Sequence, residues 1–187
     1  MVAMVAPSKF AHVVYNTHRY DEMIEWYQFV FEARVGHRGS ELAFLTYDEE
    51  HHRFAFRDLG PMPEPPVEPR MGKGPGVAHV AYTYRDLAEL VDQYSRLKER
   101  GIVPQRPIRH GMTLSMYYAD PDGNVMEFQI DLCSPEEAYE FMESDVFAAN
   151  PIGERFDPDE LVRRVAAGEP VNDLIFRSDQ PESAVPA

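Results

Sequence analysis

The sequence predicts an α+β fold in which two tandem βαβββ modules form a cupped, open mixed sheet around a metal, followed by a C-terminal helical tail. Three observations support this fold class. One segment pattern occurs twice at a fixed offset, apolar and polar residues alternate over short stretches, and one amphipathic helical stretch follows the first strand of each repeat.

The repeat carries the prediction of two modules. The letters AHVVYNT begin at Ala11 and AHVAYTY begin at Ala78, an offset of 67 residues that holds without a gap. The same offset aligns Tyr27 of the helical stripe with Tyr94. Agreement of a strand and of the helical stripe that follows it, at the same offset, indicates a duplicated module.

Each module is expected to consist of one strand, one helix and three further strands. In the first module we expect a strand at 10–16, a helix at 20–32 and strands at 34–37, 41–47 and 52–58. In the second we expect a strand at 77–83, a helix that Gly101 ends and strands at 103–106, 113–119 and 125–130. The Asp122-Gly123 pair predicts a tight turn between the last two strands.

These elements define the expected domain organisation. Residues 8–131 form a single metal-binding domain, made of modules 8–58 and 77–131 and joined by a linker rich in Pro and Gly at 59–76. Residues 132–168 form a helical extension, with helices that begin at Ser134-Pro135 and at Asp157-Pro158. Residues 176–187 are rich in Ser, Pro and Glu, and we expect them to be disordered.

Composition narrows the class of protein. A net charge of -14 argues against binding to nucleic acid or to anionic membranes, because both need a positive surface. Cys133 is the single cysteine, so no intramolecular disulfide can form, and a reducing, cytoplasmic setting is expected. No apolar run approaches the roughly 20 residues that span a bilayer. Amphipathic helices in the tail favour a homo-oligomer.

Three side chains predict a metal site. His12 and His79 occupy equivalent positions of the repeat, so the symmetry of a duplicated fold brings them together. Glu127 lies in the middle of an apolar strand, where an unpartnered carboxylate costs several kcal/mol. Two histidines and one carboxylate are the facial triad of non-haem Fe(II) oxygenases, which leaves positions open for substrate and dioxygen. Fe(II) is the expected metal, and the same ligands accept Mn(II).

The chain resembles the vicinal-oxygen-chelate superfamily, and within it the one-domain type I extradiol dioxygenases. The resemblance covers roughly residues 8–131. It implies that paired βαβββ modules enclose a metal, with ligands on the first strand of each module and on the last strand. His12, His79 and Glu127 match those places.

The resemblance also implies three catalytic residues. The letters HRFAF from His52 match a motif resembling His-x-x-Ala-Phe, and His51 is the alternative histidine. His110 and Tyr118 match a histidine and a tyrosine that precede the glutamate ligand, with Tyr117 as the alternative tyrosine. The implied roles are hydrogen bonds from Tyr118 and His110 to bound substrate oxygens, and acid catalysis by His52.

The implied function is Fe(II)-dependent extradiol cleavage of a catechol-type aromatic diol with dioxygen, in the degradation of aromatic compounds. One alternative is another metalloenzyme of the same superfamily, such as a glyoxalase-like isomerase or a thiol transferase. The isomerase needs a fourth protein ligand, for which Asp58 is the sole candidate, and Asp58 lies past the expected place. Another alternative is a metal-free resistance protein that binds an aromatic drug.

Overall fold

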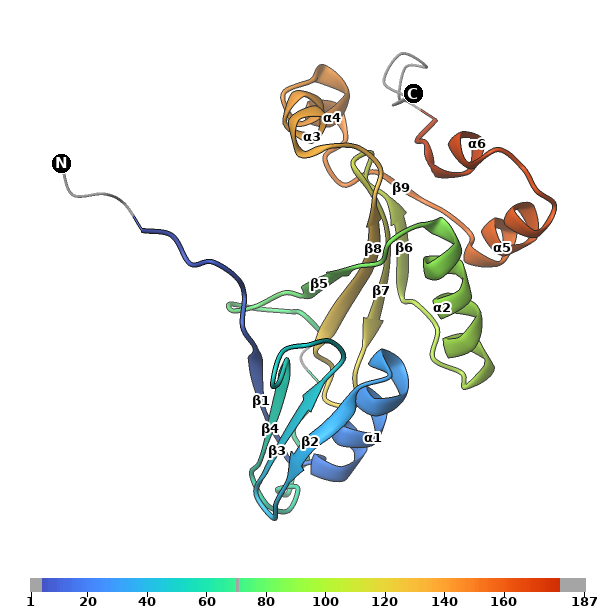
Figure 1. Cartoon of the computed structure of the whole chain (residues 1–187). Coiled ribbons are helices and arrows are strands. Elements are labelled where there is room, and N and C mark those ends of the chain that lie inside the picture. The colour runs from blue at the N-terminus through green and yellow to red at the C-terminus, as the bar shows by residue number, and fades with distance from the viewer. Residues whose placement is uncertain (1–4, 70, 179–187) are drawn as a thin grey trace. The chain divides into compact units, whose positions relative to one another are not determined.

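The computed structural model describes residues 5–69 and 71–178 of the chain. These residues form two compact units. Residues 5–69 and 120–123 make up the first, and residues 71–119 and 124–178 make up the second. Each unit is built on one open sheet, and the helix that follows its first strand lies along that sheet (Figure 1).

The first unit contains four strands and one helix: β1 (Val13–Thr17), α1 (Tyr20–Phe31), β2 (Arg34–Arg38), β3 (Leu42–Thr46) and β4 (Phe54–Asp58). Their order in the sheet is β1-β4-β3-β2, with β1 parallel to β4 and the other pairs antiparallel. The helix buries one apolar stripe, made of Met23, Ile24, Tyr27 and Val30. This stripe lies at the three- and four-residue spacing of a helix face.

The second unit repeats this order with β5 (Val80–Thr83), α2 (Leu87–Glu99), β6 (Arg106–Arg109), β7 (Thr113–Ala119) and β8 (Val125–Asp131). Its sheet has the order β5-β8-β7-β6-β9, where β9 (Glu154–Arg155) comes from the tail, and β5 is parallel to β8. The side chain of Asp86 caps α2 by accepting from the amide of Glu89, and Gly101 follows the helix at a φ of 73°. The predicted fold class and the duplicated βαβββ order are therefore confirmed.

One predicted strand lies elsewhere. The stretch 103–106 was expected to be extended, but β6 begins only at Arg106, which pairs with Tyr117 of β7. Pro104 has no amide proton to donate to a neighbouring strand, so pairing begins beyond it.

The tail contains more structure than the sequence indicates. The two expected helices are present as α3 (Pro135–Met142), capped by Ser134, and α5 (Pro158–Ala166), capped by Asp157. Three further elements lie around them: α4 (Asp145–Ala149), β9 (Glu154–Arg155) and α6 (Val171–Ile175). Strand β9 extends the second sheet by pairing with β6.

The expectation of disorder from residue 176 onward is wrong for its first residues. Arg177 is only 2% exposed, and Ser178 donates from its backbone amide to Glu154 at 2.9 Å. The tail's own helices supply the burial that the polar composition of this stretch does not suggest. The rest of the stretch, 179–187, lies outside the described residues.

The hairpin of β7 and β8 separates an apolar face from a polar one. Leu114, Met116 and Tyr118 of β7 are buried, as are Met126, Phe128 and Ile130 of β8. The residues between them point to the other face, because successive strand residues alternate. Glu127, Tyr117 and Ser115 thereby share one side of the sheet.

Candidate active site

The second unit brings two of the predicted metal ligands together. His79 immediately precedes β5, and Glu127 lies in the middle of β8, the strand that pairs with β5. The His79 Nε2 atom lies 2.9 Å from Glu127 Oε2. The glutamate is only 6% exposed, so its carboxylate is held away from most solvent and faces an imidazole.

The tyrosine beside Glu127 is Tyr117. It lies directly opposite Glu127 in the register of β7 and β8, and its hydroxyl hydrogen-bonds the carboxylate. Its ring meets that of His79 edge to face, with the centroids 5.3 Å apart.

Tyr118, which the family motif selected, points the other way. It is 1% exposed, its ring packs against Phe128, and its hydroxyl contacts Met116 Sδ at 3.5 Å. Because neighbouring residues of a strand face opposite sides, only one of the two tyrosines can reach Glu127. The structure gives that position to Tyr117, which corrects the expected placement of Tyr118.

His110 completes the cluster in this unit. Its Nε2 atom lies 2.9 Å from the Tyr117 hydroxyl and 3.8 Å from Glu127 Oε1. The backbone of Ile152 also hydrogen-bonds the ring, and this contact favours the protonated imidazole, so the ring donates and the carbonyl accepts. Since Nε2 faces Tyr117, the bond to Ile152 falls to Nδ1.

These contacts create a short path for a proton. Burial lowers the pKa of His110, although the nearby Glu127 carboxylate opposes the shift. Burial raises the pKa of Tyr117, and its hydrogen bond to Glu127 adds to the increase. The tyrosine hydroxyl has only one proton to donate. It donates this proton to His110 Nε2 when that nitrogen is unprotonated, and to Glu127 when Nε2 is protonated.

The other predicted histidines lie together in the first unit. His12 immediately precedes β1, and its ring lies 4.4 Å from the ring of His52, centroid to centroid. His52 also packs against Phe44, and burial lowers its pKa, as do His12 and His51. His51 is largely exposed and contacts His52 through the two Nδ1 atoms at 2.6 Å. Of the two alternatives, His52 is the one beside His12.

His79 and Glu127 are side chains of the kind that bind a divalent metal, and they are the two predicted ligands that lie together in the second unit. Among residues 5–69 and 71–178, no three His, Cys, Asp or Glu side chains converge as a metal site. The second unit supplies one imidazole nitrogen and one carboxylate oxygen at close range, and His12 belongs to the first unit. A buried carboxylate that faces an imidazole, with two further polar groups around it, is the environment that a metal ligand requires.

One feature of this cluster was not foreseen from the sequence, and another was named only as the alternative to Tyr118. Arg106 lies over the Tyr117 ring, with its guanidinium carbon 4.3 Å from the centroid. The choice of Tyr117 was also within reach of the sequence, because Tyr117 alternates with Ser115 and Thr113, whereas Tyr118 alternates with Met116 and Leu114. A polar face adjoining Glu127 was therefore visible in the pattern of β7.

The fold agrees with the comparisons with known proteins. The sequence pattern of the Glyoxalase/Bleomycin resistance protein/Dioxygenase superfamily matches residues 9–128. The chain belongs to this superfamily. Solved structures share the fold, among them a lactoylglutathione lyase from Agrobacterium tumefaciens, with 20% identity, 67% of this chain and 95% of that chain covered, and a TM-score of 0.52.

Two relatives are much more similar in sequence. A protein of Rhodococcus globerulus named biphenyl-2,3-diol 1,2-dioxygenase 2 is 45% identical over 170 residues, which covers 90% of this chain and 87% of the relative. A second protein of that organism, biphenyl-2,3-diol 1,2-dioxygenase 3, is 39% identical over 176 residues, covering 94% and 91%. The chain is thus similar to both relatives over almost its entire length, including the tail.

Proposed function

We propose that this protein is an extradiol dioxygenase that opens the ring of a catechol-type diol, of the 2,3-dihydroxybiphenyl kind, with dioxygen. The observation that carries the proposal is the cluster of Glu127, His79, Tyr117 and His110 in the second unit, which joins two metal-ligating groups to an acid/base pair. The two relatives named as biphenyl-2,3-diol dioxygenases support the choice of reaction and substrate class.

We assign the metal ligands to His12, His79 and Glu127, and we favour Fe(II) over Mn(II). The equivalent places of the two histidines in the repeat support this assignment, as does the contact of His79 with the buried Glu127. When bound, Fe(II) supplies a Lewis acid for the diol oxygens and the electrons that make dioxygen reactive.

Tyr117 and His110 handle the substrate proton. A diol that binds as a monoanion must lose one phenolic proton, and a basic imidazole within hydrogen-bonding reach can accept it. The lowered pKa of His110 keeps its ring neutral near pH 7 and ready to accept. Tyr117 lies between His110 and Glu127, so its hydroxyl holds the ring in place and can hydrogen-bond a substrate oxygen.

We assign His52 the role of a general acid, which donates a proton where negative charge develops on the oxygen atoms that come from dioxygen. Its place beside His12, a proposed ligand, supports the assignment, and its lowered pKa makes it a ready proton donor when charged. His51, at the exposed side of the pair, connects His52 with solvent.

A glyoxalase-like reaction fits these side chains less well. The residue considered as its fourth metal ligand, Asp58, accepts instead from the backbone amide of Gly60 at 2.9 Å and so stabilises the turn after β4. The rest of β4 offers Phe54, Ala55 and Phe56, which are buried, and the exposed Arg57, and none of these side chains binds a metal.

The test is aerobic incubation of the Fe(II)-loaded protein with catechol, 3-methylcatechol and 2,3-dihydroxybiphenyl in an oxygen electrode. A yellow ring-opened product and uptake of one dioxygen per diol are expected. If none of the diols consumes oxygen or yields a yellow product while the protein holds stoichiometric iron, the proposed function is wrong.

We also propose a cytoplasmic homo-oligomer that acts in the degradation of aromatic compounds. The single cysteine and the acidic charge support an intracellular setting. No helix among residues 5–69 and 71–178 is long and apolar enough to cross a membrane. The exposed side chains of Tyr139, Met142 and Val171 on the tail helices support self-association.

A further inference from the structure

The tail contacts the backbone around His110 at several points. His110 follows β6 and begins the short connection to β7, which is closed by a bond from the His110 amide to the Thr113 carbonyl at 2.9 Å. Strand β9 pairs with β6 and places Glu154 opposite Arg109. Arg109 in turn donates to the Leu174 carbonyl oxygen of α6 at 2.9 and 3.0 Å.

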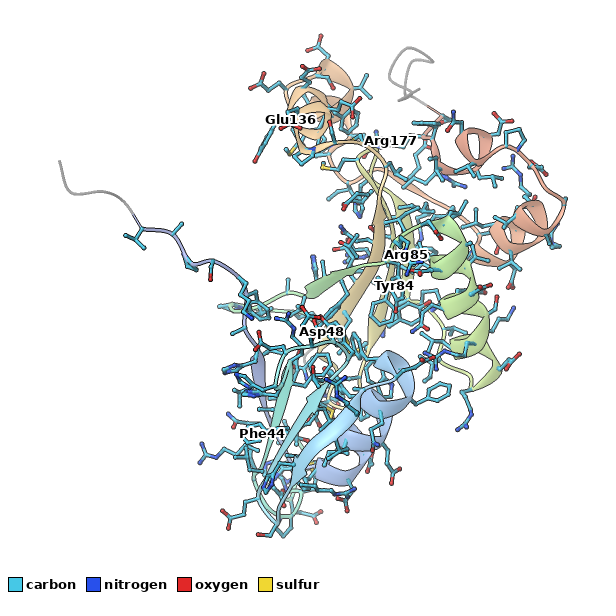
Figure 2. All side chains as sticks on the ribbon, in the orientation of Figure 1. Phe44, Asp48, Tyr84, Arg85, Glu136 and Arg177 are labelled. Atoms are coloured by element: carbon cyan, nitrogen blue, oxygen red, sulfur yellow. The ribbon has the colours of Figure 1, made fainter. Side chains whose placement is uncertain are left out.

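Arg177 makes the contact that reaches His110 itself. Its Nη1 atom donates to the His110 carbonyl oxygen at 3.1 Å and to the Asn150 carbonyl oxygen at 3.0 Å. The residue is 2% exposed, and its guanidinium lies 5.8 Å from the Phe141 ring centroid. Figure 2 shows it where the chain passes between the α3–α4 pair and α6. Because this buried cation bonds two backbone carbonyls, it holds the backbone at His110 and the backbone at Asn150 together.

The loop Asn150–Gly153 also contacts the backbone at His110. The Asn150 side chain bonds Gly153 twice, accepting from its amide at 3.0 Å and donating to its carbonyl at 3.1 Å. Gly153 has a φ of 94°, and a Cβ there would lie 2.0 Å from the Arg109 carbonyl oxygen. Its backbone therefore packs directly on the Arg109-His110 peptide, and only glycine permits this approach.

The same loop also holds the His110 ring. The Ile152 backbone hydrogen-bonds the ring at the nitrogen that does not face Tyr117. With Nδ1 bonded to a carbonyl, the neutral ring carries its proton there, and Nε2, which faces the Tyr117 hydroxyl, stays unprotonated and able to accept. Main chain and ring of His110 are thus both held by residues of the tail.

We propose that the tail is a positioning device for His110. We call the loop Asn150–Gly153 together with Arg177 the His110 clamp, and Arg177 is its positioning residue. The inference rests on the proposed function for its catalytic consequence. The clamp keeps the His110 ring in the Nδ1–H tautomer and at hydrogen-bonding distance from Tyr117, so that Nε2 is oriented to accept the substrate proton.

The variants Arg177→Met and Arg177→Lys test the clamp in the full-length, Fe(II)-loaded enzyme. Arg177→Met keeps the length of the side chain and removes both hydrogen bonds, and we expect kcat to fall by roughly tenfold or more with KM changed by less than about twofold. Arg177→Lys retains a cation that can donate, so it should restore part of kcat. The matched control is Arg155→Met, because exposed Arg155 donates to the Gln105 carbonyl oxygen at 2.9 Å and does not bond His110. This control should keep the wild-type kcat.

Two readouts separate positioning from general loss of structure. In a His110→Ala background, Arg177→Met should produce no further drop in kcat, since the residue it positions is absent. The second readout is the ¹⁵N NMR spectrum of the diamagnetic zinc(II) form, in which the His110 ring signals are identified by their absence from His110→Ala. These signals should shift away from the values of the Nδ1–H tautomer in Arg177→Met. They should not shift in Arg155→Met. If Arg177→Met does not fold, Arg177→Lys should show the same changes at smaller size.

The inference is overturned if the Arg177 variant that folds leaves the His110 ring signals unchanged. It is also overturned if Arg177→Met lowers kcat by the same factor with and without His110. If the wild-type enzyme cleaves no diol, the proposed function fails, and the ring signals alone then decide whether the clamp exists.

Discussion

Exchange of Tyr117 for phenylalanine tests the central geometry of the site. The hydroxyl lies 2.9 Å from His110 Nε2 and hydrogen-bonds the Glu127 carboxylate. Hydrogen bonds to charged groups contribute about 1.5–3 kcal/mol each. If one such bond is lost in the transition state, kcat should fall by about 10- to 150-fold. The assay is initial-rate cleavage of 2,3-dihydroxybiphenyl with iron content measured in the same samples.

Tyr118→Phe is the matched control, because it removes a hydroxyl from the next residue of the same strand. That hydroxyl bonds the weak acceptor Met116 Sδ at 3.5 Å, and the ring remains packed on Phe128. We expect kcat within about threefold of wild type, since removal of a weak bond costs little. Loss of turnover in Tyr118→Phe with normal turnover in Tyr117→Phe would refute the assignment of the two faces of β7.

Three further outcomes follow from the structure. His79→Ala should lose most bound iron, measured by elemental analysis after desalting, because Glu127 then lacks its imidazole neighbour at 2.9 Å; a variant with stoichiometric iron would contradict the ligand assignment. His52→Ala should retain iron and lose turnover, whereas His51→Ala should keep most of it, since His52 is the one packed on His12; equal losses in oxygen-electrode assays would contradict this distinction. Phe128→Ala should lower the free energy of unfolding by about 3–5 kcal/mol, because the ring is fully buried against three tyrosines, and chemical denaturation measures the change.

Much of the fold was predictable because its signals are local. The helix that follows the first strand of each module repeats an apolar stripe every three or four residues, and the strands alternate every two. The N-caps Ser134 and Asp157, each followed by proline, mark α3 and α5. The duplication of the pattern around Ala11 and Ala78 indicates the order of elements in both modules.

The elements that were missed depend on contacts distant in sequence. Strand β9 has two residues and exists because β6 offers a free edge. The order around Arg177 depends on Phe141, Asn150 and His110, which lie 27 to 67 residues away along the chain. A composition rich in Ser, Pro and Glu indicates disorder only when no folded partner is available.

In the candidate site, too, some features follow from local sequence signals and others depend on contacts distant in sequence. The residue types follow from the sequence alone: two histidines at equivalent places of a repeat, a carboxylate in an apolar strand, and a second group of histidines and tyrosines. The alternation of Thr113, Ser115 and Tyr117 in β7 favours Tyr117, but its position opposite Glu127 follows from the tertiary structure, because cross-strand register depends on how β7 and β8 pair. The tertiary structure also shows that Arg177 of the tail bonds the His110 carbonyl oxygen. A hydrogen bond between residues 67 positions apart leaves no periodic trace in the sequence.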